Sequence, residues 1–471
     1  MLFNSIDFLF FFIVVYGLYL ILNHKWQNWL LIVASCVFYA TWNWKFLFLM
    51  FLSISTDFWC SKYIDLTINV NKRRLLLWTS LTVNLLILGF FKYYNFFIGN
   101  VQDVLKSFNI VCPSLNLTLR IILPLGISFY TFEAISYVVD VYRRQVKPAQ
   151  RYWDYVLFVI YFPHLIAGPI MRAKNFLPQI TSPRQLHLEQ FYEGCHLFFW
   201  GLFEKIFVAD NLAKIVNPVF GSSMPYEGGH VLVALYAFAF QIFCDFDGYS
   251  NMARGLGKCM GFEISINFRL PYYATNPKEF WRRWHMTLSS WLRDYIYIPL
   301  GGNREGQLRM YGSLMATMLL GGLWHGASWT FVLWGAYHGA LLCGHKVFDT
   351  FDGGLKRLNF KGSRILITIL FFHTVVLGWL LFRATSVHQV KEMLCSMLVG
   401  FHPTEFMDVF SKFLFFVTPL FLVQMGQLKT GDLMFLFKMP KIIKIVAYAL
   451  MTYLVLGFGV VRPEKFIYFQ F

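Results

Sequence analysis

Apolar runs long enough to cross a lipid bilayer recur along this chain of 471 residues. A helix needs about 20 mainly apolar residues to span the hydrocarbon core, where each backbone polar group must be hydrogen-bonded within the protein. Hydrophobic residues make up 57% of the sequence and charged residues only 14%, whereas soluble domains carry about 25% charged residues. The sequence therefore predicts an all-α polytopic membrane protein.

Basic clusters between these runs predict which side of the membrane each loop occupies. Lys72-Arg73-Arg74 and Arg143-Arg144 follow alternate runs, and such clusters collect on the cytoplasmic side. Counting from them places both termini outside the cytoplasm, Asn100 outside, and Lys361 inside. About eleven spans are expected, at residues 6–22, 29–41, 46–60, 75–91, 119–141, 191–208, 231–244, 328–348, 365–382, 413–425 and 445–461.

Several stretches are predicted to interrupt this pattern. Residues 155–170 contain two prolines and a glycine, which favours a re-entrant hairpin. The helix that reaches Cys244 is expected to break at Asp245, and residues 299–304 (PLGGNR) should end a helix over 277–297. No internal repeat or linker is visible, so residues 1–471 are expected to form one domain, and an inverted-repeat transporter is not favoured.

The net charge of +16 has a simpler explanation than nucleic-acid binding. Lys and Arg in cytoplasmic loops set topology, and no basic low-complexity tail or nucleic-acid motif is present. The eight cysteines are scattered without a CxxC pair, which indicates neither a disulfide framework nor a zinc site. We therefore expect no nucleic-acid partner and no metal.

One stretch, residues 268–338, carries most of the side chains that could do chemistry. It contains FWRRWHMTLSSWLRDYIYIPLGGNR (280–304) and GGLWHGASW (321–329), each with a histidine directly after a tryptophan, His285 and His325. Charge in apolar surroundings is costly unless paired or hydrated, so it marks a candidate site. The charged residues around His285 are Arg282, Arg283, Arg293 and Asp294.

Spacing alone leaves two interpretations of each histidine. In a helix over 277–297, Trp281, His285 and Leu288 would share an apolar face, where a histidine more often packs than reacts. Residues 310–323 are too short to cross the bilayer at about 1.5 Å per residue, so His325 would lie part-way through it. There it could act as general base for a hydroxyl attacking an acyl group, or bond a carbonyl in helix packing. The glycines beside it, Gly321, Gly322 and Gly326, would let a backbone or ligand come close.

Other candidate residues favour structure over catalysis. His338 and His345 share a helix face, and no third ligand has metal-site spacing. Asp245 and Asp247 are expected to pair with the arginines of the predicted helix over 277–297 or to cap a broken helix end. The role of His164 stays open.

Four segments together resemble the membrane-bound O-acyltransferase (MBOAT) family. They are YFPHLIAGPIMR (161–172), DFDGYSNMARGLGKCMGF (245–262), FWRRWHMTLSSWLRDYIYIPLGGNR (280–304) and LWHGASWTFVLWGAYHG (323–339). The likeness is strongest to the bacterial AlgI-like branch of polysaccharide O-acetyltransferases, with the DltB-like D-alanyltransferases as a related branch. The segment IPLGGNR and the ending FIYFQF favour the AlgI-like branch.

The resemblance implies an MBOAT fold, in which tilted and re-entrant helices surround a central tunnel that opens to the cytoplasm. It implies that His325 is the histidine found throughout the family and His285 the second histidine of bacterial members. We expect Asp245, Trp324 and Asn303 to line or support the tunnel. It further implies a bacterial inner-membrane location with periplasmic termini, and a periplasmic SGNH-type acetyltransferase partner.

The resulting hypothesis is an acyltransferase that carries an acyl group, foremost acetyl, from a cytoplasmic thioester to an extracytoplasmic polysaccharide. The acceptor would be an alginate-like exopolysaccharide or peptidoglycan. The donor, acetyl-CoA or an acyl-carrier thioester, is a co-substrate, and no bound cofactor is expected. Because the donor carries phosphate, Arg282 and Arg304 are candidate donor-binding residues. The alternative is a transporter or lipid flippase without covalent chemistry. The two Trp-His motifs and the absence of an internal repeat argue against that alternative.

Overall fold

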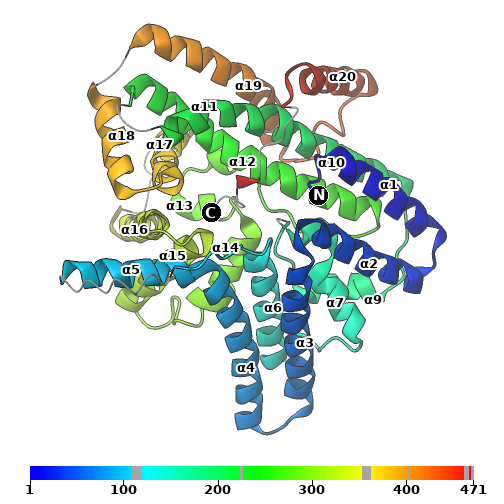
Figure 1. Cartoon of the computed structure of the whole chain (residues 1–471). Helices are drawn as coiled ribbons and strands as arrows, with labels where there is room; N and C mark the ends of the chain where they lie inside the picture. Colours follow the sequence, from blue (N-terminus) through cyan, green and yellow to red (C-terminus); the bar gives the residue numbers. More distant parts are fainter. Residues whose placement is uncertain are drawn as a thin grey trace. The chain divides into compact units, whose positions relative to one another are not determined.

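The computed structural model describes residues 1–108, 118–166, 168–222, 226–352, 362–399, 402–460 and 466–467. Every regular element in these ranges is a helix (Figure 1), which agrees with the predicted all-α class. The contacts within the chain gather in two units. The expectation of a single domain over residues 1–471 stays a prediction.

The first unit comprises residues 1–187, 260–264 and 326–328. α3 (Lys45–Leu66) and α4 (Val70–Leu88) pack as an antiparallel pair, visible in blue in Figure 1. The polar centre of that pair is the buried carboxylate of Asp57, which accepts hydrogen bonds from Ser80 and Asn84 at 2.5 and 2.8 Å. The helices of this unit are α1 (Ile6–Ile21), α2 (His24–Asn43), α3 (Lys45–Leu66), α4 (Val70–Leu88), η1 (Gly89–Tyr93), α5 (Tyr94–Ser107), α6 (Ile127–Tyr142), α7 (Tyr152–Ile160), α8 (Phe162–Leu165) and α9 (Ala173–Thr181).

The second unit comprises residues 188–259, 265–325 and 329–471 and holds the candidate site. The first part of it contains α10 (Leu188–Phe203), η2 (Glu204–Ala209), α11 (Asp210–Gly221), α12 (Gly228–Cys259), η3 (Pro271–Tyr273), α13 (Pro277–Trp281), α14 (Met286–Leu292) and η4 (Arg293–Tyr297). The second part contains α15 (Gln307–His325), α16 (Trp329–Asp352), α17 (Ser363–Arg383), α18 (Val387–Val399), α19 (Pro403–Thr430) and α20 (Lys441–Phe458).

Five of the described helical segments are long and apolar enough to cross a membrane. They are Val70–Ser107, Gly228–Cys259, Ser363–Arg383, Phe406–Thr430 and Lys441–Phe458, and each overlaps a span predicted from the sequence. The other predicted runs form helices that miss the length or the hydropathy required, and the run at 119–141 is helical only from Ile127. The count of about eleven spans therefore stays a prediction.

The expected break at Asp245 is wrong, because α12 continues without interruption to Cys259. Two features of the second unit allow this. The carboxylate of Asp245 is neutralised by the ammonium of Lys205, 2.7 Å away. Glycines also let α10 and α12 come close: a Cβ on Gly194 would lie 2.7 Å from the carbonyl oxygen of Gly255, so only Gly fits there.

The expected single helix over 277–297 is also wrong. It is split into α13, α14 and the π-helical turn η4, and the last residue before α14 is His285, with φ +39°. That left-handed conformation is uncommon for a residue with a Cβ. Trp281 and His285 therefore do not share the face of one helix. The break after residue 298 is confirmed, with Gly301 and Gly302 at φ +113° and +55°.

Candidate active site

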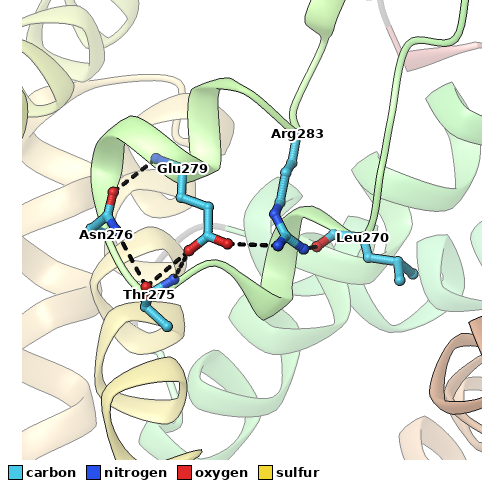
Figure 2. Close-up of polar contacts among 5 residues, drawn as sticks. All are labelled: Leu270, Thr275, Asn276, Glu279 and Arg283. Atoms are coloured by element: carbon cyan, nitrogen blue, oxygen red, sulfur yellow. Dashed lines mark hydrogen bonds and ion pairs between the residues drawn. The ribbon is translucent and has the colours of Figure 1, made fainter. Parts of the chain in front are cut away.

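A capped turn fixes the start of the central stretch. Asn276 accepts a hydrogen bond from the backbone N–H of Glu279 at 2.8 Å, and Glu279 accepts from both the N–H and the hydroxyl of Thr275 at 2.8 Å (Figure 2). Pro277 occupies the first turn of α13, where its missing N–H costs nothing. These contacts make residues 275–279 a rigid platform from which the chain enters the segment that holds His285.

Arg283 ties this platform to the preceding segment. Its guanidinium lies 2.6 Å from Glu279 and donates to the carbonyl of Leu270 at 3.3 Å (Figure 2). The expected i,i+4 pair of Glu279 and Arg283 is thus present. Burial, which alone would raise the pKa of Glu279, is outweighed by the hydrogen bonds from Thr275 and by the charge of Arg283, so the pKa is lowered. Arg283 therefore serves the local fold.

His285 is fully buried, and the side chain of Asn267 holds its ring. The imidazole Nδ1 lies 3.1 Å from Asn267 Oδ1. Phe246 of α12 packs edge-on against the ring, with centroids 4.6 Å apart. Both are in the second unit, and together they leave the imidazole little freedom to rotate.

His325 ends α15 and is 3% exposed. A close crossing of α15 and α16 positions it, since a Cβ on Gly322 would collide with the carbonyl of Phe331 and one on Gly335 with the carbonyl of Met318. Gly322, in the last turn of α15 before His325, thus lets the backbone of α16 come close. The imidazole then packs edge-on against Trp334 of α16, with centroids 4.9 Å apart.

One indole contacts both histidines of the Trp-His motifs. The ring centroid of Trp324 lies 5.9 Å from that of His285 and 5.0 Å from that of His325. A third histidine joins through Trp334, whose ring lies 4.7 Å from His338. The structure thus gathers His285, His325 and His338 in one buried aromatic cluster of the second unit, and it gives Trp324 a place at its centre.

Asp245 belongs to a separate buried ion cluster. The Lys205 ammonium lies 2.7 Å from both Asp245 and Asp210, and the backbone N–H of Ile467 donates to Asp245 at 2.7 Å. The expected pairing of Asp245 with arginines of the central stretch is therefore replaced by Lys205. Because these three residues are at most 3% exposed, each charge needs the others to offset its desolvation, and the cluster therefore serves the fold.

A cavity of about 530 Å³ opens beside α14 within the second unit. Its floor is apolar, with Met286, Leu292 and Met318 among the lining residues, and its rim carries more positive than negative charge. Arg282 lines this cavity and forms no ion pair with any described residue, whereas Arg304 is exposed and is not among the lining residues. Asn303 also lines it and accepts a hydrogen bond from Tyr297 at 2.6 Å. The charged rim is formed by Lys278, Arg282, Arg293, Lys346 and Asp349.

Comparison with known proteins decides the family. The family model described as MBOAT, membrane-bound O-acyltransferase family, matches residues 8–388. The chain belongs to this family. It is thus a multi-pass membrane protein and an O-acyltransferase, and the matched range includes both Trp-His motifs.

Individual relatives support the same placement of this MBOAT chain. It is 41% identical over 395 residues to the probable alginate O-acetylase AlgI of Pseudomonas putida, covering 83% of this chain and 79% of that protein. It is 36% identical over 430 residues to the peptidoglycan O-acetyltransferase of Helicobacter pylori, covering 84% and 80%. A teichoic acid D-alanyltransferase of Bacillus subtilis is 27% identical over 280 residues, covering 56% and 70%. The bacterial AlgI-like placement is confirmed.

Two buried polar residues of this MBOAT chain, one in the candidate site and one in the separate ion cluster, were not anticipated from the sequence. Asn267 lies in an irregular segment, and nothing in its neighbours along the chain reveals that it contacts His285. Lys205 had a visible signal: together with Glu204 it interrupts an apolar run, and such intramembrane charge calls for a partner. Asp210, five residues later, is that partner on the same chain segment.

Proposed function

We propose that this chain transfers an acetyl group from a thioester donor at the cytoplasmic face to a hydroxyl acceptor on the outer side, for O-acetylation of a polysaccharide. The observation that carries the proposal is the contact of His285 and His325 with one buried indole, next to a basic cavity in the same unit. The names of the relatives support an alginate-like polymer or peptidoglycan as the final acceptor.

In the proposed reaction His325 acts as general base. It removes the proton of the accepting hydroxyl as the oxygen attacks the thioester carbonyl, the carbon–sulfur bond breaks, and the thiolate leaves with a proton. His285 orients the attacking hydroxyl. Burial of both rings among Trp and Phe side chains supports this role, because a water-poor site suppresses hydrolysis of the thioester.

The donor is proposed to dock in the cavity beside α14. Its phosphates would meet Arg282 at the rim, where a planar guanidinium can hold two phosphate oxygens. The apolar floor suits the pantetheine arm and the acyl group. Arg304 stays a second candidate, at the exposed turn next to Asn303. Acetyl-CoA and an acyl-carrier thioester share the phosphopantetheine arm, so either fits this proposal.

The pathway around the enzyme follows from the positions of donor and acceptor. We place the chain in a bacterial inner membrane with its termini on the periplasmic side. An SGNH-type periplasmic acetyltransferase would complete transfer onto the polymer. A tunnel through the protein would carry the acyl group between the two faces, which keeps the donor away from the outer side.

The test is to replace each histidine and measure acetyl ester on the polymer made by the cells. His325→Ala is expected to abolish the ester and His285→Ala to reduce it strongly, with normal amounts of protein in the membrane. His373→Ala is the matched control, because this histidine of α17 is exposed and bonds only its own helix carbonyl at Ile369. Wild-type ester levels in His325→Ala cells would overturn the assignment.

A further inference from the structure

The hydrogen bonds around Asn267 determine which ring nitrogen of His285 carries the proton. Asn267 Oδ1 lies 3.1 Å from His285 Nδ1, and it also accepts from the backbone N–H of Thr287 at 3.3 Å and from the Thr287 hydroxyl at 2.8 Å. A backbone N–H can only donate, so the Asn267 atom that faces it is the oxygen and not the amide nitrogen. His285 Nδ1 therefore donates to that oxygen and must be protonated.

The same residue is held in place from its other side. Asn267 Nδ2 donates to the hydroxyl of Ser250 on α12 at 3.3 Å, and the backbone carbonyl of Asn267 accepts from the backbone N–H of Met286 at 2.8 Å. Asn267 is 1% exposed and His285 is 0% exposed. Because the side-chain amide has partners at both Oδ1 and Nδ2, it cannot flip without leaving buried groups unsatisfied, which costs about 1–3 kcal/mol for each.

The strained backbone of His285 belongs to the same arrangement. At φ +39° the residue directly precedes the first turn of α14, and such a conformation persists only where the surroundings impose it. Here the Met286 and Thr287 N–H groups, the first two after His285, both bond to Asn267. One asparagine thus fixes the backbone turn and the imidazole together.

We propose that Asn267 is the positioning residue of His285, fixing it as the tautomer with the proton on Nδ1 and the lone pair on Nε2. A neutral His285 in this state can accept a hydrogen bond or a proton at Nε2 but cannot donate one from that nitrogen. In the acyl transfer its Nε2 would accept a hydrogen bond from a second O–H or N–H group of the bound acceptor and so orient the attacking hydroxyl, whose own single hydrogen goes to His325. The inference rests on the proposed role of His285 and names the residue through which that role is set.

The test is a double-mutant cycle on the purified, detergent-solubilised enzyme, with acetyl-CoA and a hydroxyl acceptor. Asn267→Ala is expected to lower kcat about 10- to 100-fold, as loss of a partner that orients a functional histidine does, with less than about a twofold change in the KM for acetyl-CoA. In a His285→Ala background the same substitution should change kcat no further, because its effect passes through the imidazole. A purely structural role would lower kcat in both backgrounds.

Two further variants separate orientation from loss of stability. Asn267→Asp keeps an oxygen facing Nδ1 and should retain most of the kcat that Asn267→Ala loses. Thr287→Val removes one donor to Asn267 without touching His285, so it is the matched control and should change kcat less than about threefold. Thermal melting of each variant identifies any that is unfolded, and the Asn267→Asp comparison then decides.

The outcomes distinguish this inference from the function on which it rests. If His285→Ala leaves kcat unchanged, the proposed role of His285 fails. If His285→Ala lowers kcat while Asn267→Ala does not, or if the two losses multiply in the double variant, only the positioning role of Asn267 is overturned.

Discussion

Reversing the charge of Arg282 should weaken binding of the thioester donor far more than it slows the chemical step. The guanidinium is exposed at the rim of the 530 Å³ cavity, and no described acidic residue forms an ion pair with it. A hydrogen bond to a charged group contributes about 1.5–3 kcal/mol, and exposure to water favours the lower end. Arg282→Glu should therefore raise the KM for acetyl-CoA roughly 10- to 30-fold, with kcat changed less than about twofold at saturation.

Matched variants and a matched substrate make this measurement specific. Arg309→Glu removes a guanidinium of the same stretch that is not among the cavity-lining residues and pairs with Glu305, so it should leave the KM unchanged. An acetyl thioester without phosphate, such as S-acetyl-N-acetylcysteamine, should show the same KM with wild type and Arg282→Glu. The wild-type KM for acetyl-CoA should also rise with salt, since exposed charges are screened.

The reasoning is refuted if folded Arg282→Glu keeps the wild-type KM for acetyl-CoA. It is equally refuted if the KM rises as much for the phosphate-free thioester, because the residue would then act on the acyl end of the donor. An effect of Arg304→Glu larger than that of Arg282→Glu would place the phosphates at the turn that holds Asn303.

Three other predictions concern stability and topology. Gly322→Ala should destabilise the protein by about 1–3 kcal/mol, because the added Cβ would meet the Phe331 carbonyl. The control Gly312→Ala, on the same helix but with open space around it, should be neutral or stabilising by up to about 1 kcal/mol. Equal melting temperatures of the two variants in detergent would contradict the close crossing of α15 and α16. Glu279 has a lowered pKa in the folded state, so its contribution to folding stability is present above about pH 4 and is lost as pH falls through the folded pKa. As pH is lowered from 7 to 3, the melting temperature should therefore fall less steeply for Glu279→Gln than for wild type. Parallel curves would show that the ion pair of Glu279 with Arg283 does not stabilise the fold. A cysteine at Asn100 should react with a membrane-impermeant reagent in intact spheroplasts, whereas a cysteine at the exposed Arg74 should not. Arg74 is chosen because the neighbouring Arg73 bonds the Tyr142 carbonyl. The reverse labelling pattern would invert the predicted topology; Lys361 and the C-terminal Phe471, for which it was also predicted, lie outside the described residues.

Local signals in the sequence predicted the helices and the candidate histidines. Long apolar runs identify helices because a bilayer demands them, and each of the five described segments able to span a membrane overlaps a predicted run. The first turn of α13 was also readable, since Pro277 and the spacing of Glu279 and Arg283 act within a few residues. The Trp-His motifs singled out His285 and His325 for the same reason: a polar ring in an apolar segment is visible without knowledge of its neighbours.

Errors arose where a residue's partner lies far along the chain. A helix break was expected at Asp245 because a carboxylate in an apolar helix looks unsatisfied, yet Lys205, forty positions earlier, pairs with it. A continuous helix was expected through His285 because periodicity cannot register the Asn267 contacts that bend the chain there. In both cases a tertiary contact supplied the free energy that overrode the local preference.

The sequence by itself determined that this chain is a multi-pass helical membrane protein of the MBOAT family with two marked histidines, because hydropathy and motif identity are properties of consecutive residues. Only the tertiary structure decided that Trp324 contacts both histidines, that Arg282 but not Arg304 lines the basic cavity, and that Asn267 sets the protonated nitrogen of His285. Those facts depend on which side chains meet across different helices. That pairing is settled by packing and by the need to satisfy each buried polar group, which no spacing along the chain records.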